Sequence, residues 1–122
     1  MNLIIFSEGE ATRQEVVTAV RVAGVNGPVE VYPTCETFHQ RLRGPKLLGA
    51  LIIIALQQRR TLETLIREKE LVRDIRTIVV PPDDDMETIV RAHLLRPRFV
   101  IFKEDIAEKL PKVLTKMDDT RH

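Results

Sequence analysis

Apolar runs alternate along the chain with amphipathic stretches, and the longest run lies near its middle. Leu47–Leu56 contains ten residues without a charge, among them three consecutive isoleucines. Because isoleucine is stiff at χ1 and packs well on a pleated surface, this run predicts a strand over Ala50–Ala55. The lack of alternation indicates burial on both faces, as in the middle strand of a parallel sheet. The run is too short to span a bilayer.

Four further strands are predicted from shorter apolar or alternating runs. They cover Leu3–Phe6, Val29–Tyr32, Arg76–Val80 and Phe99–Phe102. Of these, Val29–Tyr32 alternates between apolar and polar residues, which is typical of a strand with one wetter face near the edge of a sheet.

Helical spacing of apolar positions predicts a helix after every strand. The predicted helices cover Ala11–Ala23, Cys35–Leu42, Thr61–Arg73, Met86–Leu95 and Ile106–Met117. We expect Thr34 to cap the second helix. The inward side of the fourth helix is expected to consist of Met86, Ile89, Val90 and Leu94. One domain is expected over residues 1–117, followed by a flexible tail over residues 118–122.

Strand and helix thus alternate five times with short connections between them. Right-handed crossovers convert such a pattern into a parallel sheet with helices on both faces. The predicted fold is therefore an α/β three-layer sandwich whose five-stranded sheet has the order 2-1-3-4-5. In this order the carboxyl ends of the first and third strands flank the crevice where open sheets usually bind ligands.

Composition adds few constraints on function. The chain carries 19 basic and 18 acidic residues, so a net charge of +1 predicts neither a nucleic acid nor a membrane as partner. The single cysteine, Cys35, excludes an internal disulfide and suits the cytoplasm; we expect a small buried apolar residue rather than a reactive thiol. A signal peptide is not expected, because Glu8 interrupts the first apolar run.

The residues at the carboxyl ends of four predicted strands carry a family resemblance. The positions are Ser7 and Glu8 after the first strand, Ala55 after the third, Pro81 after the fourth and Lys103 after the fifth. In order and spacing, the chain resembles the CheY-like receiver domain of response regulators over nearly its whole length. The resemblance implies a flavodoxin-like (βα)5 fold and a cytoplasmic role in two-component signal transduction.

Three of the five positions depart from the receiver pattern. Receivers place two acids after the first strand, the phosphoacceptor aspartate after the third and a Ser or Thr after the fourth. Here Ser7 replaces one acid, Pro81 replaces the hydroxyl residue, and Ala55 replaces the acceptor, or Leu56 does if the register slips by one. Lys103 matches the receiver lysine and is expected to lie beside Glu8.

These departures remove the chemistry of phosphoryl transfer. Neither alanine nor leucine supplies a nucleophile, and losing two of three carboxylates removes most of the affinity for Mg²⁺. The sequence therefore predicts a degenerate pseudo-receiver that is not phosphorylated on aspartate, uses no metal or cofactor, is not an enzyme and binds another protein. The alternative is a small-molecule-binding or enzymatic flavodoxin-like domain that uses the crevice between Ser7–Glu10 and Gln57–Arg60. No glycine-rich phosphate loop supports that alternative.

The partner-binding face is predicted from the same resemblance. In receivers the fourth helix, fifth strand and fifth helix form the usual dimer or output face, which implies a protein partner or a homodimer here. Leu95 and Ile106 are expected to form the apolar centre of this face. Around them we expect charges of both signs, suited to pairing across a two-fold axis: Arg91, Arg98, Glu104, Asp105, Lys109 and Lys112.

Three other groups of polar residues have a simpler structural explanation. Asp83–Asp85 could bind a divalent cation, but acids at this place are expected to begin a helix and complement its dipole. His39 and His93 are expected to be partly buried or interfacial rather than catalytic. Four arginines could contact phosphates, although no aromatic residues are interleaved with them: Arg41, Arg43, Arg59 and Arg60.

Overall fold

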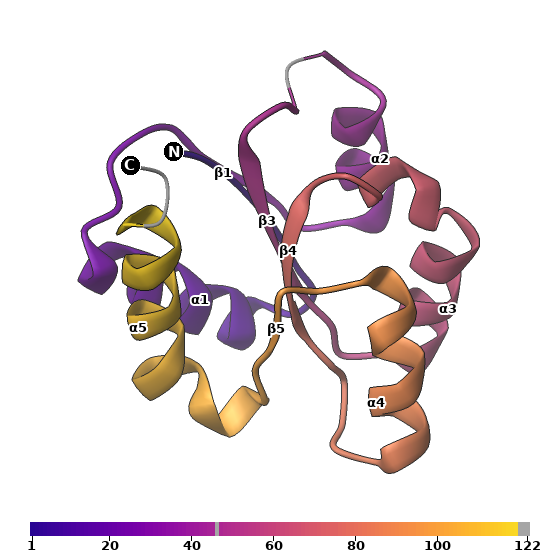
Figure 1. The fold of residues 1–122 in the computed structure, drawn as a ribbon. Helices are drawn as coiled ribbons and strands as arrows, with labels where there is room; N and C mark the ends of the chain where they lie inside the picture. The colour runs from indigo at the N-terminus through magenta and orange to yellow at the C-terminus, as the bar shows by residue number, and fades with distance from the viewer. Residues whose placement is uncertain (46, 120–122) are drawn as a thin grey trace.

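A parallel β-sheet forms the middle layer of the protein (Figure 1), as described by a computed structural model for residues 1–45 and 47–119. Its order is β2-β1-β3-β4-β5, with every neighbouring pair parallel, which confirms the predicted topology. The strands are β1 (Asn2–Ser7), β2 (Val29–Tyr32), β3 (Ala50–Ala55), β4 (Arg76–Val80) and β5 (Phe99–Val100).

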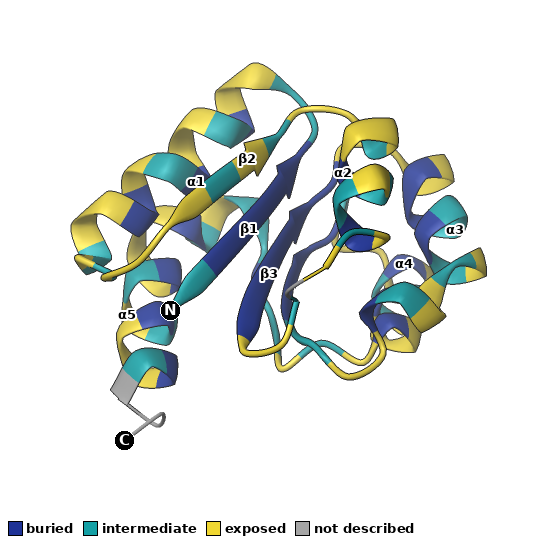
Figure 2. Cartoon of the chain, turned by 90° about the horizontal axis from the view of Figure 1, so that it is seen from above, coloured by how far each residue is buried: buried dark blue, intermediate teal, exposed yellow. Residues whose placement is uncertain are grey.

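Helices cover both faces of this sheet. Helices α1 and α5 lie together on one face, and α2, α3 and α4 cover the other, which gives the expected three layers (Figures 1 and 2). The helices are α1 (Glu10–Ala23), α2 (Cys35–Leu42), α3 (Arg59–Arg67), α4 (Met86–Ala92) and α5 (Ile106–Asp119). Three single turns of 3-10 helix accompany them: η1 (Lys69–Val72), η2 (His93–Leu95) and η3 (Lys103–Asp105). None of the helices described has the length and apolar character needed to cross a membrane.

The central strand β3 explains the long apolar run of the sequence. All six of its residues are buried, because successive side chains point into different layers (Figure 2). Ile53 packs in the cluster that includes residues of α1 and α5. Ile52 and Ile54 pack in the cluster that includes residues of α2, α3 and α4. Burial on both faces therefore requires apolar residues at every position.

Two local predictions are confirmed. The hydroxyl of Thr34 accepts a hydrogen bond of 3.2 Å from the backbone N–H of Thr37, so Thr34 caps α2. Strand β2 lies at the edge of the sheet, where Val29 and Val31 are exposed while Glu30 is half-buried (Figure 2).

The predicted helix over Thr61–Arg73 is wrong at both ends. Helix α3 begins at Arg59 and ends at Arg67, and a 3-10 turn, η1, follows it. The residues between Ile66 and Leu71 are all charged, so they provide no apolar stripe to hold a longer helix against the core. The tighter turn brings Val72 back into the interior, where it is buried.

The fourth helix buries the opposite side from the one predicted. Met86, Val90 and Leu94, three of the four residues expected to face inward, are exposed. The buried residues of α4 are Thr88 and Ala92. Their side chains are small, so the helix can approach the sheet closely along this side. The α-helical part also ends at Ala92, and His93–Leu95 form the 3-10 turn η2.

The last strand is shorter than predicted, and the last helix is longer. Strand β5 comprises only Phe99 and Val100, because Phe102 already precedes the turn η3 and accepts a hydrogen bond from the N–H of Asp105. Helix α5 continues through Asp118 and Asp119, the first two residues of the predicted tail. Residues 120–122 of that tail lie outside the described part of the chain.

Candidate functional site

The sheet brings the predicted site positions together at its carboxyl edge. Ser7, Ala55 and Val80 lie side by side as the last paired residues of β1, β3 and β4. The next residues continue this register, since the N–H of Glu8 donates to the carbonyl of Ala55 at 2.9 Å. The N–H of Leu56 likewise donates to the carbonyl of Val80 at 2.9 Å. The sequence therefore located this edge of the sheet correctly.

The acceptor position holds a buried apolar side chain in either register. Ala55 is the last residue of β3, and Leu56 follows it. Both are fully buried, in the clusters on opposite faces of the sheet. Ser7 and Pro81 are buried as well. Neither the Ala55 nor the Leu56 side chain can act as a nucleophile.

The one acid left at the end of β1 caps a helix. One carboxylate oxygen of Glu8 accepts hydrogen bonds from the backbone N–H groups of Gln57, at 2.9 Å, and Gln58, at 3.2 Å. The other oxygen accepts from the hydroxyl of Thr61 at 2.7 Å. These donors belong to the start of α3, where N–H groups lack helical partners and the helix dipole favours a negative charge. Glu8 is thus a structural anchor between two loops, a role that its position in the sequence did not reveal.

The crevice beside Glu8 is occupied by protein atoms. Gly9 has a φ of +80°, in the region that favours glycine. A Cβ atom at Gly9 would lie 2.1 Å from the side-chain nitrogen of Gln57. The turn after β1 and the loop after β3 therefore lie in direct contact, at the place where the alternative function requires room for a ligand.

The acidic run before α4 binds Arg59, the first residue of α3. Nε of Arg59 donates to Asp83 and Nη2 donates to Asp85, each over 2.8 Å. Asp85 precedes α4, as predicted for a capping acid, but its side chain makes no capping hydrogen bond. Arg59 lowers the pKa of the Asp83 carboxyl from its ordinary value of 3.8 to about 2, with a smaller contribution from Thr88. The run thus acts as the counter-charge of Arg59.

The Arg59→Gln variant is expected to raise the pKa of Asp83 from about 2 towards 3.8, because the main group that stabilises the carboxylate is lost. In the unmodified protein the ion pair stabilises the fold at pH values above 3.8, the ordinary pKa of aspartate. This contribution is lost as the pH falls towards 2. An NMR titration of the side-chain carboxyl carbon measures the change. The Arg60→Gln variant is the control, since Arg60 donates to Gln58 instead. Equal titration of Asp83 in both variants would contradict the assignment.

Lys103 does not contact Glu8. It lies beside a hollow of about 170 Å³ whose lining also includes Pro81, Asp83 and Asp84. Within the described part of the chain, Lys103 makes no hydrogen bond or ion pair. Among the described residues no ion pair joins Lys103 to Glu8, and the hollow that Lys103 lines contains Glu104 and two acids of the β4–α4 loop.

The remaining candidate residues are the cysteine, two histidines and four arginines. Burial raises the pKa of the half-buried Cys35 thiol, and the negative charges of Glu8 and Glu68 raise it further. A raised pKa disfavours a reactive thiolate. His39 is half-buried, with Nε2 3.0 Å from the carboxylate of Glu68, whereas His93 is exposed. The prediction of partial burial thus holds for His39 alone. Three of the four arginines are held in ion pairs: Arg59 as above, Arg41 with Glu30 at 2.7 Å and Arg43 with Glu68 at 3.9 Å.

The predicted partner-binding face requires a correction at its centre. Leu95 is 3% exposed and Ile106 is fully buried, so both belong to the core and cannot form a surface centre. Arg91 turns towards α3, where its Nε donates to Glu63 at 2.8 Å. On the α5 side, Lys109 lies 3.3 Å from Asp105. Exposed charges at the predicted positions remain at Arg98, Glu104, Lys109 and Lys112.

Apolar residues are nevertheless present on the outer side of α4. Met86, Val90 and Leu94 are 71%, 58% and 39% exposed, respectively. Met86 and Val90 lie four residues apart on one side of α4, and Leu94 follows in η2; these three exposed residues are here called the apolar strip. The sequence contains these residues in a helical pattern, but that pattern alone does not distinguish an inward row from an outward one.

Similar folds occur among solved structures. The receiver domain of the stress response regulator RcsB from Escherichia coli, in its non-phosphorylated form, aligns with a TM-score of 0.68 and 16% identity, over 98% of this chain and 94% of that one. The chain has the receiver fold. A pilus assembly-related protein from Burkholderia pseudomallei shares it, with a TM-score of 0.67 and 18% identity over 98% of this chain and 90% of that one.

A third structure with the receiver fold is the pilus assembly protein CpaE from Burkholderia thailandensis. It aligns with a TM-score of 0.55 and 19% identity, over 94% of this chain and 99% of that one. No family model matches the sequence, and no curated protein matches it. The relationship is therefore one of three-dimensional structure.

Proposed function

We propose that this chain is a receiver-like protein-interaction module of bacterial signal transduction that is not phosphorylated on aspartate and catalyses no reaction. One observation carries the proposal: three acids at the carboxyl edge of the sheet, Glu8, Asp83 and Asp85, are already bound to protein groups. Glu8 holds the start of α3, and Asp83 and Asp85 hold Arg59. A receiver that is phosphorylated on aspartate would need free carboxylates there to bind Mg²⁺ and accept a phosphoryl group.

The binding surface of this module is the outer side of α4 together with the neighbouring face of β5 and α5. The apolar strip replaces Leu95 and Ile106 as the centre of this surface. Exposed charges of both signs lie on the following elements, with Arg98 before β5, Glu104 in η3 and Lys112 on α5. An apolar centre with a charged rim is the usual anatomy of a protein interface.

The similar structures support a bacterial setting for the module. One is a receiver domain of a stress response regulator, and two carry the name of pilus assembly proteins. We therefore place the chain either in a response-regulator pathway or in a surface assembly system. The cytoplasm suits it, because the only cysteine of the chain, Cys35, is a free thiol.

The direct test is incubation with a small phosphodonor and Mg²⁺, followed by intact-mass measurement. We expect no increase by the mass of a phosphoryl group, while a receiver that carries the acceptor aspartate, treated in parallel, gains it. Calorimetry is expected to find no Mg²⁺ site tighter than roughly 10⁻⁴ M. A hydroxylamine-labile adduct at Glu8, Asp83 or Asp84 would overturn the proposal.

The alternative function is tested in a thermal-shift screen with nucleotides, flavins and divalent cations. A ligand at one hundred times its Kd adds about 2.7 kcal/mol of stability, which is readily detected. We expect no shift, because the contacts of Glu8 and Gly9 with the Gln57 loop fill the crevice that such a ligand would use. A reproducible shift that the Gly9→Ala variant abolishes would favour the small-molecule function.

A further inference from the structure

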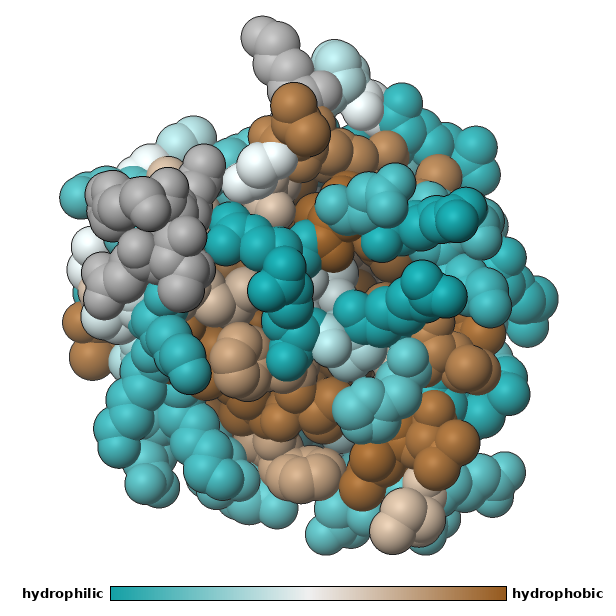
Figure 3. All heavy atoms as spheres, in the orientation of Figure 1, coloured by the Kyte–Doolittle hydropathy of each residue, from teal (hydrophilic) through white to brown (hydrophobic). Residues whose placement is uncertain are grey.

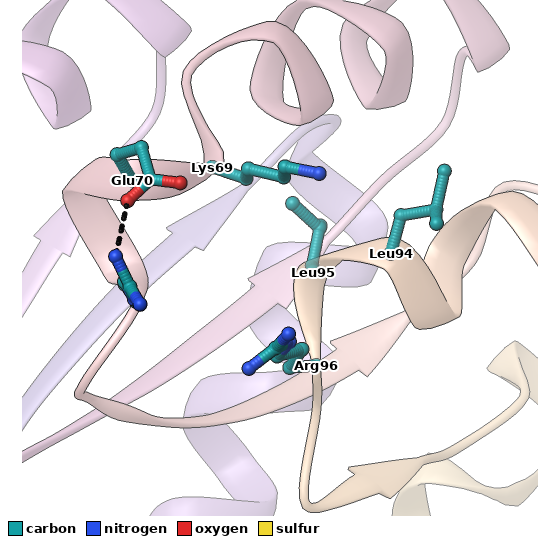
Figure 4. Close-up of a pocket in the computed structure, with 6 residues that line it drawn as sticks. Lys69, Glu70, Leu94, Leu95 and Arg96 are labelled. Carbon is teal, nitrogen blue, oxygen red and sulfur yellow. Dashed lines mark hydrogen bonds and ion pairs between the residues drawn. The ribbon is translucent and has the colours of Figure 1, made fainter.

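A pocket lies at the amino edge of the sheet. It is built by the two 3-10 turns η1 and η2, which contact each other shortly before β4 and β5 begin. Its volume is about 170 Å³, and its lining consists of Lys69, Glu70, Arg73, Leu94, Leu95 and Arg96 (Figure 4). In the space-filling view, hydrophilic side chains gather right of centre, above the hydrophobic side chains at the lower right, where Figure 1 places α4 (Figure 3). The pocket is therefore separate from the carboxyl edge that carries Ser7, Glu8 and Ala55.

The charges of this pocket do not balance. Its lining contains three basic side chains and one acidic side chain. Glu70 lies 3.2 Å from Arg73 and forms an ion pair with it. The exposed side chains of Lys69 and Arg96 flank Leu95, and neither makes an ion pair within the described part of the chain (Figure 4). Two positive charges of the pocket therefore have no counter-charge among the described residues.

The backbone of Arg96 is strained. Among the described residues, Arg96 is the only one other than glycine with a positive φ, at +53°. It ends η2 in the left-handed conformation, a place where glycine is the usual residue because it has no Cβ. Arginine adopts this conformation at a cost in free energy. A strained position that holds arginine rather than glycine points to a use for the guanidinium group.

The size and the charge of the pocket favour a phosphate group as its ligand. Drug-sized ligands fill about 300–1,000 Å³, so the pocket encloses a small anion rather than a whole nucleotide. A phosphate monoester carries a charge of about −1.5 to −2 at neutral pH, which matches two positive charges better than the single charge of a carboxylate does. Arginine can donate two parallel hydrogen bonds to phosphate oxygens, and lysine binds them as a compact charge.

We propose that the pocket between η1 and η2 binds the phosphate group of a small molecule, either inorganic phosphate or a phosphate monoester. Lys69 and Arg96 bind the phosphate oxygens. Leu94, which is 39% exposed, offers an apolar contact to the organic part of a monoester. Because η1 follows α3 and η2 follows α4, the bound phosphate joins the ends of two helices.

This inference goes beyond the proposed function and does not depend on it. The phosphodonor experiment tests the carboxyl edge of the sheet, whereas the pocket lies at the amino edge. A thermal shift that arises from phosphate in the pocket should persist in the Gly9→Ala variant, because Gly9 follows β1 at the opposite edge. The two sites can therefore be tested separately.

An NMR titration of the isotope-labelled chain with inorganic phosphate and with phenyl phosphate tests the site. We expect saturable shift changes of the backbone amides of residues 69–73 and 94–96, with a Kd tighter than roughly 1 mM. Equal affinities would identify the phosphate group alone as the ligand, while tighter binding of phenyl phosphate would identify a monoester that also contacts Leu94. The proposal is overturned if no saturable change occurs, if the changes lie at other residues, or if acetate binds as tightly as phosphate.

The variant with Lys69→Gln and Arg96→Gly removes both uncompensated charges of the pocket. It should bind phosphate at least about tenfold more weakly, since two charge-assisted contacts are lost. Its melting temperature should not fall, because glycine adopts the left-handed conformation without strain. Lys69→Gln alone leaves the backbone at Arg96 unchanged and should also weaken binding. Unchanged affinity in the double variant would overturn the site.

Lys112→Gln with Lys116→Gln is the matched control. It removes two exposed positive charges from α5, on the other face of the sheet, and should leave the affinity for phosphate unchanged. An equal loss of affinity in this control would overturn the proposal, because it would mean that the net charge of the chain, rather than this pocket, attracts the anion.

Discussion

Replacing Phe38 with alanine is expected to lower the free energy of unfolding by about 3–5 kcal/mol. The Phe38 ring is fully buried and stacks on Phe6, with a centroid distance of 5.0 Å and an interplanar angle of 14°. It therefore joins α2 to β1, and its loss leaves a cavity as well as unburied apolar surface. Equilibrium denaturation in urea measures the change as a lower midpoint.

The control for Phe38→Ala is an apolar truncation at the surface. Leu48 is completely exposed in the loop before β3, so Leu48→Ala should change the free energy of unfolding by no more than about 0.5 kcal/mol. Similar effects of the two substitutions would show that α2 is not packed on the sheet in the way described.

Replacing Glu8 with alanine is expected to cost about 1–3 kcal/mol of stability. The substitution removes the acceptor of three hydrogen bonds and leaves the N–H groups of Gln57 and Gln58 without their carboxylate partner. Hydrogen exchange should show faster exchange of these two amides, and urea denaturation should show the lower stability. Glu15→Ala, on the exposed side of α1, is the control and should be nearly neutral.

Added Mg²⁺ distinguishes the structural role of Glu8 from a metal-binding one. If Glu8 serves as a helix cap, the stability difference between Glu8→Ala and the unmodified chain should be the same with and without the ion. A difference that grows in Mg²⁺ would contradict the capping role, because it would mean that Glu8 binds the ion in the folded state.

The topology could be predicted from the sequence because it depends on long apolar runs. Ala50–Ala55 is apolar throughout since both faces of β3 are covered, whereas in the edge strand β2 the valines are exposed and Glu30 and Tyr32 are the more buried residues. The alignment of Ser7 with Ala55 follows from the same pattern, because parallel strands that begin together also end together. The neighbourhood of Ser7 and Ala55 at the carboxyl edge of the sheet could therefore be predicted from the sequence.

The orientation of α4 could not be read from its sequence. Apolar residues at helical spacing usually face the core, yet here small residues, Thr88 and Ala92, line the inward side. Leu95, which the receiver resemblance placed at the centre of a surface, is instead buried at the end of this inward side. In a helix of seven residues the pattern is too short to distinguish a row that packs on the sheet from a row that faces outward.

The contacts of the candidate site were equally hidden from the sequence. Glu8 binds groups about 50 residues away along the chain, and Arg59 binds acids 24 and 26 residues away. No local spacing encodes such pairs, because they depend on which loops the sheet order brings together. The sequence therefore cannot show whether an acid at the position of a family's metal ligand has a free carboxylate or one that accepts hydrogen bonds at the start of a helix.

The anchoring of the two loops beside α4 also bears on the thermodynamics of recognition. Arg59 ties the loop that leads into α4 to the start of α3, and Glu8 ties the residues just before α3 to the end of β1. The outer side of α4 is thus held in one conformation before any partner arrives. A preorganised surface loses little conformational entropy on association, so even a small contact area can yield a measurable affinity. Recognition by this domain then becomes rigid-body docking, in which the orientation of the two molecules limits the association rate.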